Sequence, residues 1–221
     1  MQRDLSMKLL INSSTLILCM AITACSTTGK QERVGAQAGR SGSSVANFES
    51  RESRAWVADH EASVREAVKG SQFEVERRGD LLVVTAPVDS SFNPDRPSML
   101  LVATLGPLSR VAKLAAQDRE VAVLLLGHGD SSGSAELTNR LSQERAQSMA
   151  AIFRMSGLHH DRLMYKGMGS DVPRSSNANK DGRSLNRRVE MYLTTRSSLP
   201  AVLAQYGAPG IRVVASDQAK R

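Results

Sequence analysis

The stretch that decides the fold reads VAVLLLGHGDSSGSAELTNRLSQERA and spans residues 121–146. Its first six residues are all apolar, which predicts a central strand covered on both faces. Apolar residues at helical spacing then predict a helix over about 135–155, with Gly157 placed to end it. Asp130 lies between strand and helix, just past the carboxyl end of the strand, where open α/β sheets commonly bind ligands.

Four separated blocks carry a resemblance to a known family. The chain has GHGD at 127–130, Asn139 with LSQERA at 141–146, GMG at 167–169 and NRRV at 186–189. These blocks resemble the GHTD, NxxLSxxRA, GxG and NRRV blocks of the OmpA-like peptidoglycan-binding family. Four blocks in the same order are a more specific match than any single short motif. The resemblance covers residues 79–195 and is strongest to outer-membrane members similar to peptidoglycan-associated lipoproteins.

The amino terminus indicates export. Basic Arg3 and Lys8 precede a mostly apolar run of ~14 residues, which is shorter than the about 20 that a membrane-spanning helix needs. This pattern predicts a signal peptide over residues 1–24, with Met7 as an alternative start. The run ends in ITACS at 22–26, which looks like a bacterial lipobox.

The lipobox resemblance implies cleavage before Cys25 and lipidation of that cysteine. The alternative is ordinary signal cleavage beside an incidental cysteine. Because Ser26 and not aspartate follows the cysteine, the family sorting rule favours the outer membrane, with the protein lipid-anchored and facing the periplasm. The other cysteine, Cys19, would leave with the signal peptide, so no intramolecular disulfide is expected in the mature chain.

Domain boundaries follow from composition and periodicity. Residues 25–55 are expected to be the lipidated cysteine and a flexible tether, because residues 26–53 are rich in Gly, Ser, Gln and Arg. Residues 56–78 should form a helix from Trp56 to near Gly70 and then a strand of a hairpin. Residues 79–196 should be the OmpA-like domain, and 197–221 a basic tail.

Within the domain, the order of elements predicts an α/β sandwich of βαβαβ type, with a mixed sheet packed by helices. A helix starting near Pro97 contains Pro107, which predicts a kink or a break. A long polar loop is expected over 167–182. Alternating Val189, Met191 and Leu193 predict a last strand.

Composition limits the classes of partner. The 221-residue chain carries a formal net charge of +7, which suits nucleic acid, anionic lipid or an anionic wall polymer. Only 4% of the residues are aromatic, no nucleic-acid-reading motif is present, and the export signal argues further against nucleic acid. Peptidoglycan, the outer membrane and other envelope proteins remain as partners, and no cofactor is expected.

The central chemical hypothesis concerns Asp130 and Arg145. Diaminopimelate in a peptidoglycan stem peptide carries an ammonium and a carboxylate on one carbon, so its recognition needs an anion and a cation close together. Arg145 lies four residues after Leu141 and four before Met149, on or beside the helix face that packs on the sheet. The resemblance implies that Asp130 and Arg145 bind this group. The alternative is that the two residues bridge each other.

Three further positions match the family's site. Asn139 is matched to the family asparagine and could bond ligand amides, although an exposed helix amide is the alternative. Leu141 is mainly core, with its backbone bordering the site. Arg188, the second arginine of NRRV, points opposite Val189 by strand parity. Contact of Arg188 with ligand is one expectation, and the alternative is that it makes no such contact. Arg187 is expected instead to pair with a structural acid.

The chain departs from the family pattern at two residues. Gly129 replaces the threonine of GHTD, and Thr138 stands where an aromatic residue commonly precedes the asparagine. A threonine at 129 is expected to strengthen binding only if that backbone position has negative φ.

Two other chemistries, serine-protease catalysis and metal binding, fit the sequence less well. Residues 129–133, GDSSG, are similar to the segment around a serine-protease nucleophile, but the region of His60 lies outside the expected sheet and no two-barrel β pattern is present. The four histidines, at 60, 128, 159 and 160, do not have the usual spacing of metal ligands. The sequence therefore predicts a noncatalytic peptidoglycan-binding protein. The alternative is an envelope or secretion-system assembly protein that uses the same fold for protein interactions.

Overall fold

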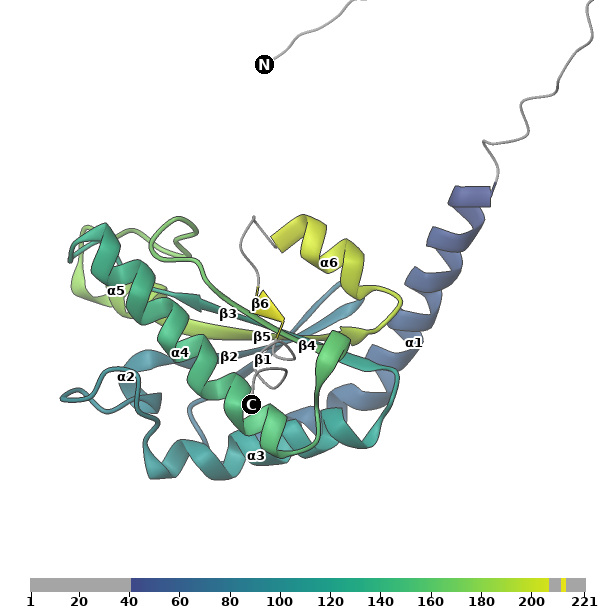
Figure 1. Cartoon of the computed structure of the whole chain (residues 1–221), viewed down its shortest axis with the longest axis horizontal. Coiled ribbons are helices and arrows are strands. Elements are labelled where there is room, and N and C mark those ends of the chain that lie inside the picture. The colour runs from purple at the N-terminus through teal and green to yellow at the C-terminus, as the bar shows by residue number, and fades with distance from the viewer. Residues whose placement is uncertain (1–40, 207–211, 214–221) are drawn as a thin grey trace, which may run out of the picture. The chain divides into compact units, whose positions relative to one another are not determined.

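The computed structural model describes residues 41–206 and 212–213 (Figure 1). The predicted signal peptide, Cys25 and the tether up to residue 40 lie outside the described residues. Within the described part of the chain, no helix has the length and hydropathy needed to cross a membrane.

A six-stranded mixed sheet forms the centre of the fold, in the order β1-β2-β5-β3-β4-β6 (Figure 1). Strands β3 and β4 pair in parallel, and all other neighbouring strands pair antiparallel. The predicted α/β architecture with a mixed sheet is confirmed. The strands are β1 (Glu74–Arg78), β2 (Leu81–Pro87), β3 (Val121–His128), β4 (Leu163–Gly167), β5 (Arg188–Thr195) and β6 (Arg212–Val213).

Helices cover both faces of the sheet. On one face, α1 (Ser41–Val68), α3 (Val102–Gln117) and α4 (Ala135–Met155) pack on Val123 and its alternate neighbours. On the other face, α6 (Leu199–Tyr206) packs on Leu124. Because β3 is covered on both faces, it is buried along its whole length, as its unbroken apolar run predicts. The remaining helices are α2 (Val88–Ser91), a 3-10 turn (His160–Arg162) and α5 (Lys180–Asn186).

Helix α1 differs from the prediction at its start and agrees at its end. It begins at Ser41, in the segment expected to be coil, and not at Trp56. Inside the expected coil, the buried Ser53 hydroxyl bonds the hydroxyls of Thr195 and Ser198 at 2.9 and 2.8 Å. These contacts join residues far apart in sequence, so local composition does not report them. The helix ends just before Gly70, as expected, and that glycine has φ +77°.

Helix α3 also differs from the prediction. It begins at Val102, after Pro97, and it runs unbroken through Pro107 to Gln117. Pro107 provides no N–H for the carbonyl of Ala103, but Ala103 is exposed, so water can satisfy that carbonyl.

The carboxyl-terminal residues assigned to a tail include part of the core. Leu199 and Val202 of α6 are buried against the sheet, and Leu203 and Tyr206 pack beside them. Helix α6 therefore covers sheet residues that would otherwise be exposed on this face.

Candidate functional site

The site lies where β3 and β4 end and α4 begins, and glycines bring these elements together. Gly127 and Gly167 pair across the two strands. A Cβ on Gly127 would lie 2.0 Å from the Ser142 carbonyl oxygen, and one on Gly167 would lie 2.5 Å from the Gln143 nitrogen. Helix α4 therefore packs directly on bare strand backbone. This close approach places the side chains of α4 beside the loop that carries Asp130.

The turn after β4 is held by side chains of α4. The Gly167 N–H donates to Gln143 Oε1 at 2.5 Å, and the Gly169 N–H donates to Ser142 Oγ at 3.0 Å. Gly169 has φ +55°, a left-handed conformation that favours glycine. The GMG block at 167–169 thus serves backbone conformation and close packing, as predicted.

Asp130 is buried, with 7% of its surface exposed, and both of its carboxylate oxygens have donors. Ser132 donates to Oδ1 from its amide at 2.9 Å and from its hydroxyl at 2.5 Å. Arg187 donates from Nη1 to Oδ2 at 2.5 Å. The same guanidinium binds Asp89 through Nε at 2.9 Å and Nη2 at 2.6 Å. Arg187 therefore bridges two acids, one buried and one exposed.

These contacts keep Asp130 ionised. Burial by itself raises the pKa of the Asp130 carboxyl, but the two hydrogen bonds from Ser132 and the bond and charge of Arg187 outweigh burial and lower the pKa. The site therefore presents a fixed negative charge at neutral pH.

Arg145 is also buried, with 9% of its surface exposed, and it lies on the inner face of α4 as predicted. Its Nε donates to the Pro97 carbonyl at 2.8 Å, and its guanidinium carbon lies 5.8 Å from the Phe92 ring centre. Among the described residues no carboxylate forms an ion pair with it. Burial lowers the pKa of Arg145, and repulsion from Arg187 lowers it further.

The two residues expected to bind ligand therefore do not bridge each other. Asp130 is paired with Arg187, while Arg145 is a buried cation that has no paired anion in the described part of the chain. They are close enough for Asp130 to act electrostatically on Arg145. The arrangement offers a stabilised carboxylate and an unpaired guanidinium in one region, which suits a ligand that carries both charges.

Asn139 and Leu141 lie on the same helix near this region. Asn139 is exposed, and its Oδ1 fills the space beside Gly169, where a Cβ would come within 1.7 Å of it. Leu141 is half-buried. In the NxxLS spacing, the position three residues before Leu141 is Thr138, so the match of Asn139 to the family asparagine was one residue out of register.

Thr138 instead lies against the acid loop. A Cβ on Gly129 would lie 2.4 Å from Thr138 Cγ2. The two departures from the family pattern are thus in contact, and a side chain at 129 would compete with Thr138 for the same space. Residue 129 lies outside the left-handed region of φ, so the space and not the backbone decides what fits there.

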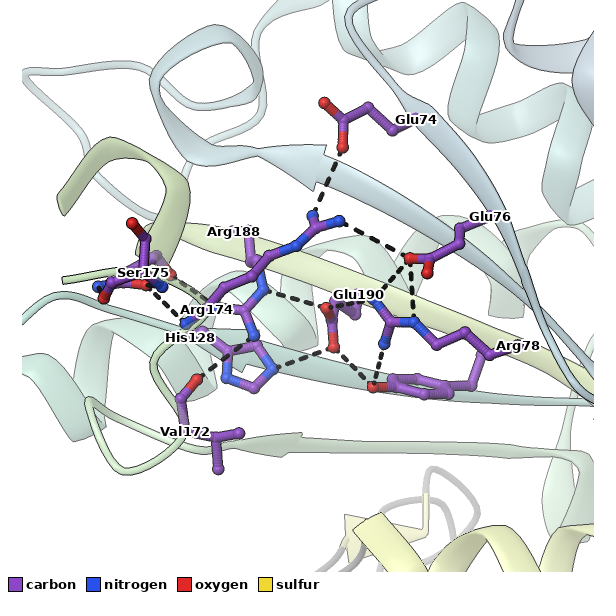
Figure 2. A network of polar contacts seen from close by, with 11 residues as sticks. Glu74, Glu76, Arg78, His128, Val172, Arg174, Ser175, Arg188 and Glu190 are labelled. Atoms are coloured by element: carbon purple, nitrogen blue, oxygen red, sulfur yellow. Dashed lines mark hydrogen bonds and ion pairs between the residues drawn. The ribbon is translucent and has the colours of Figure 1, made fainter. Parts of the chain in front are cut away.

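Arg188 is not brought together with Asp130 and Arg145. Val189 faces the α4 side of the sheet, so Arg188 points to the opposite side, where it is 4% exposed. Figure 2 shows it beside Glu190, to which Arg188 Nε donates at 3.1 Å. Its other donors reach the carbonyls of Asn186 at 3.2 Å and Val172 at 3.3 Å. Strand parity and this buried acid place Arg188 in an internal network.

Glu190 is the centre of that network (Figure 2). Its carboxylate accepts from the Tyr192 hydroxyl at 2.6 Å and from Arg78 at 3.4 Å, and His128 Nε2 lies 3.6 Å away. Burial raises the pKa of Glu190, but these contacts and Arg188 outweigh it, so the pKa lies well below its usual range. Burial lowers the pKa of His128, so the imidazole is neutral at neutral pH, and neither ring nitrogen has a hydrogen-bond partner among the described residues.

The sequence did not single out several residues that organise the site. Asp89 and Ser132 hold Arg187 and Asp130, and nothing in their local sequence marks them. Asn186, the first residue of NRRV, is fully buried and bonds the backbone of Arg174 and Ser175 through Oδ1 at 2.7 and 2.8 Å. The sequence predicts that Arg187 pairs with a structural acid. In the structure it pairs with two acids, and one of them, Asp130, is itself a candidate site residue.

The described residues contain no group of three or more His, Cys, Asp or Glu side chains that could hold a metal ion. Within the GDSSG segment at 129–133, the Ser132 hydroxyl donates to Asp130.

Comparisons with known proteins give similarities over the segment that contains this site. Residues 101–187 match the model of the OmpA family. The probable lipoprotein YiaD of Escherichia coli is 33% identical over 134 residues, which are 61% of this chain and 61% of that protein. The outer-membrane lipoprotein YfiB of Pseudomonas aeruginosa is 38% identical over 71 residues, 32% of this chain and 42% of YfiB. The match thus spans less than two thirds of either relative.

Two more similarities concern the cell wall. The peptidoglycan-binding protein ArfA of Mycobacterium tuberculosis is 35% identical over 94 residues, 42% of this chain and 29% of ArfA. The solved cell wall anchor of the type VI secretion system (T6SS) from Pseudomonas aeruginosa is 28% identical with a TM-score of 0.50, covering 64% of this chain and 95% of that one. The chain thus carries a domain of the OmpA family, which spans residues 101–187 and contains Asp130, Arg145 and Arg187.

Proposed function

We propose that this protein binds peptidoglycan without catalysis, through the diaminopimelate group of a stem peptide, and so links the outer membrane to the cell wall. The observation that carries the proposal is Arg145, a buried guanidinium with one hydrogen bond and no paired carboxylate among the described residues. An unpaired buried charge is costly, so a ligand carboxylate that pairs with it is strongly favoured.

The roles follow from charge. The ligand ammonium binds the Asp130 carboxylate, which Ser132 and Arg187 keep ionised. The ligand carboxylate binds the fork of Arg145. Asn139 and Leu141 border the ligand from α4. Arg188 lies on the opposite side of the sheet and does not contact the ligand.

The link to the membrane rests on the amino terminus. Cys25, in its lipobox-like setting, is the proposed lipidation site, and the following residues are the tether. The names of YiaD and YfiB as lipoproteins support this assignment. ArfA, named as peptidoglycan-binding, supports the wall-binding half of the proposal.

The alternative function is a role in an envelope or secretion assembly. It is favoured by the similarity to a protein described as the cell wall anchor of a secretion system. In that case the same site would hold the assembly to the wall, or another surface would carry the function.

The test is cosedimentation of the full-length mature protein with purified sacculi. We expect the wild type to sediment with sacculi and Arg145→Ala to remain in the supernatant, with a loss of about 2–4 kcal/mol of binding. Arg140→Ala is the matched control, because Arg140 is an exposed arginine of the same helix with 66% side-chain exposure. A wild type that never sediments contradicts the proposal, as does an Arg145→Ala variant that binds as tightly as the wild type.

The diaminopimelate assignment has its own test. Calorimetry with a diaminopimelate-containing stem peptide should give binding that Asp130→Asn and Arg145→Ala abolish. Sacculus binding without binding of this peptide would retain the wall function and reject the ligand assignment.

A further inference from the structure

A groove between α1 and α3 lies apart from the candidate site. Its volume is about 720 Å³. From α1 and the turn after it, Ser63, Glu66, Ala67 and Gly70 line the groove, spaced as one helical face. Its α3 wall has the same spacing and consists of Arg110, Lys113, Leu114 and Gln117.

The groove combines an apolar floor with positive charge. Ala67 and Leu114 supply apolar surface, while Lys69, Arg110 and Lys113 surround it. Lys69 is already paired with Glu66 at 3.3 Å. Arg110 donates Nε to the Ala67 carbonyl at 2.7 Å, which fixes its side chain across the groove without neutralising it. Among the described residues, neither Arg110 nor Lys113 has a carboxylate partner, so both charges face the groove unpaired.

Polar groups in the lining favour a peptide over an acyl chain. Ser63 and Gln117 are exposed side chains that can donate to and accept from a peptide backbone. An acyl chain would cover these side chains without offering them a hydrogen-bond partner. It would also place apolar atoms beside the Arg110 guanidinium and the Lys113 ammonium. An acidic segment with an apolar side chain satisfies the floor, the polar groups and the charges together.

We propose that the α1–α3 groove is a docking site for an acidic protein segment that carries an apolar anchor residue. One wall of the groove, α1, lies outside the OmpA-family match at residues 101–187. The groove is therefore built partly from a helix outside that match, and its lining residues are separate from those of the candidate site. A partner held here would be joined to the cell wall through the other site of the same protein.

The test uses a labelled, end-blocked peptide of sequence Glu-Leu-Phe-Glu-Asp-Leu and the full-length mature protein. Fluorescence anisotropy should give saturable binding that weakens at least about threefold in Lys113→Glu, as expected for reversing one exposed charge. Ser63→Trp, which fills the groove from the exposed side of α1, should abolish binding. Arg154→Glu, an exposed charge on α4, is the matched control and should bind as the wild type does.

Three outcomes overturn the proposal. The first is the absence of saturable peptide binding. The second is equal binding of a Lys-Leu-Phe-Lys-Lys-Leu peptide. The third is binding of phosphatidylglycerol vesicles, with Lys113 required, in place of the peptide, which would make the groove a membrane contact. Sacculus cosedimentation of Lys113→Glu should be unchanged in every case, so failure here is distinguishable from failure of the wall-binding proposal.

Discussion

Arg145 and Arg187 show how two arginines of one site differ in what they do for stability. Arg187 forms ion pairs with the buried Asp130 and the exposed Asp89, whereas Arg145 is a buried charge with no ion pair to any residue that the structure describes. Holding a binding residue in an unfavourable state before ligand arrives is a common cost of function. The proposed ligand, by supplying the missing anion, would remove that cost.

This contrast predicts opposite stability effects. Arg145→Leu should leave the free energy of unfolding within about 1 kcal/mol of the wild type, or raise it, because it removes an unpaired buried charge. Arg187→Leu should lower it by about 3 kcal/mol, because Asp130 is left buried and unpaired. Both should lose ligand binding. Urea unfolding measures the difference, and equal destabilisation by the two variants would contradict it.

Gly129 and Thr138 form a second pair, in which the effect of a substitution at one position depends on the residue at the other. The condition that φ at 129 is not positive is met, yet Thr138 Cγ2 occupies the space that a side chain needs. Restoring threonine at 129 is therefore expected to weaken binding and stability, which reverses the expectation drawn from φ alone.

The pair predicts a rescue. Gly129→Ala should destabilise the protein by about 1–3 kcal/mol through overpacking. Adding Thr138→Ala removes the clashing methyl group and should recover most of that loss, because the Thr138 Cβ itself lies 3.8 Å away, an ordinary contact. A double-mutant cycle in urea checks it. Additive losses in the double variant would show that the two positions do not compete for space.

At the scale of elements, the position of α4 depends on two strand glycines, whose lack of a side chain lets the helix pack directly on the strands. Gly127→Ala places a Cβ 2.0 Å from backbone that cannot rotate away, so α4 must shift from the strand ends. We expect a loss of about 3 kcal/mol of stability, at the upper end of overpacking costs, and weaker ligand binding because Arg145 moves with its helix. Gly133→Ala is the control, since its nearest neighbour would be 3.7 Å away. Wild-type stability of Gly127→Ala in urea would contradict this account of the packing.

At the scale of the whole molecule, buried ionisable groups make stability depend on pH. The pKa values of Glu190, Asp130 and His128 all lie below their ordinary values of 4.5, 3.8 and 6.5 in the folded state. As the pH falls, the unfolded chain binds protons at these groups before the folded chain does. The free energy of unfolding should therefore be greatest above the ordinary histidine pKa and fall on acidification.

This prediction can be assigned to single residues. His128→Phe should flatten the loss of stability that begins below about pH 6.5, and Glu190→Gln should flatten the loss that begins below about pH 4.5. Urea unfolding across the pH range measures both slopes. Unchanged slopes in both variants would show that other groups carry the pH dependence.

Much of the fold could be predicted because its elements are locally encoded. The apolar run of β3, the capped helix α4 and the hairpin of β1 and β2 all have patterns that act over a few residues. The part of α1 around Ser53 and the role of α6 could not be predicted in this way, because their buried residues contact distant parts of the chain. A polar helical segment is stabilised mainly by tertiary contacts, here those that Ser53 makes with Thr195 and Ser198.

For the site, the sequence by itself determined the chemical identity of the candidate residues and their order along the chain. Asp130 lies in the loop before α4 and Arg145 on the inner face of that helix, and both are buried. Only the tertiary structure decided which charges pair. Ion pairing depends on distances of a few ångströms between residues from different elements. Arg187, which is distant from Asp130 in the sequence, therefore binds Asp130, and Arg145 has no ion pair among the described residues.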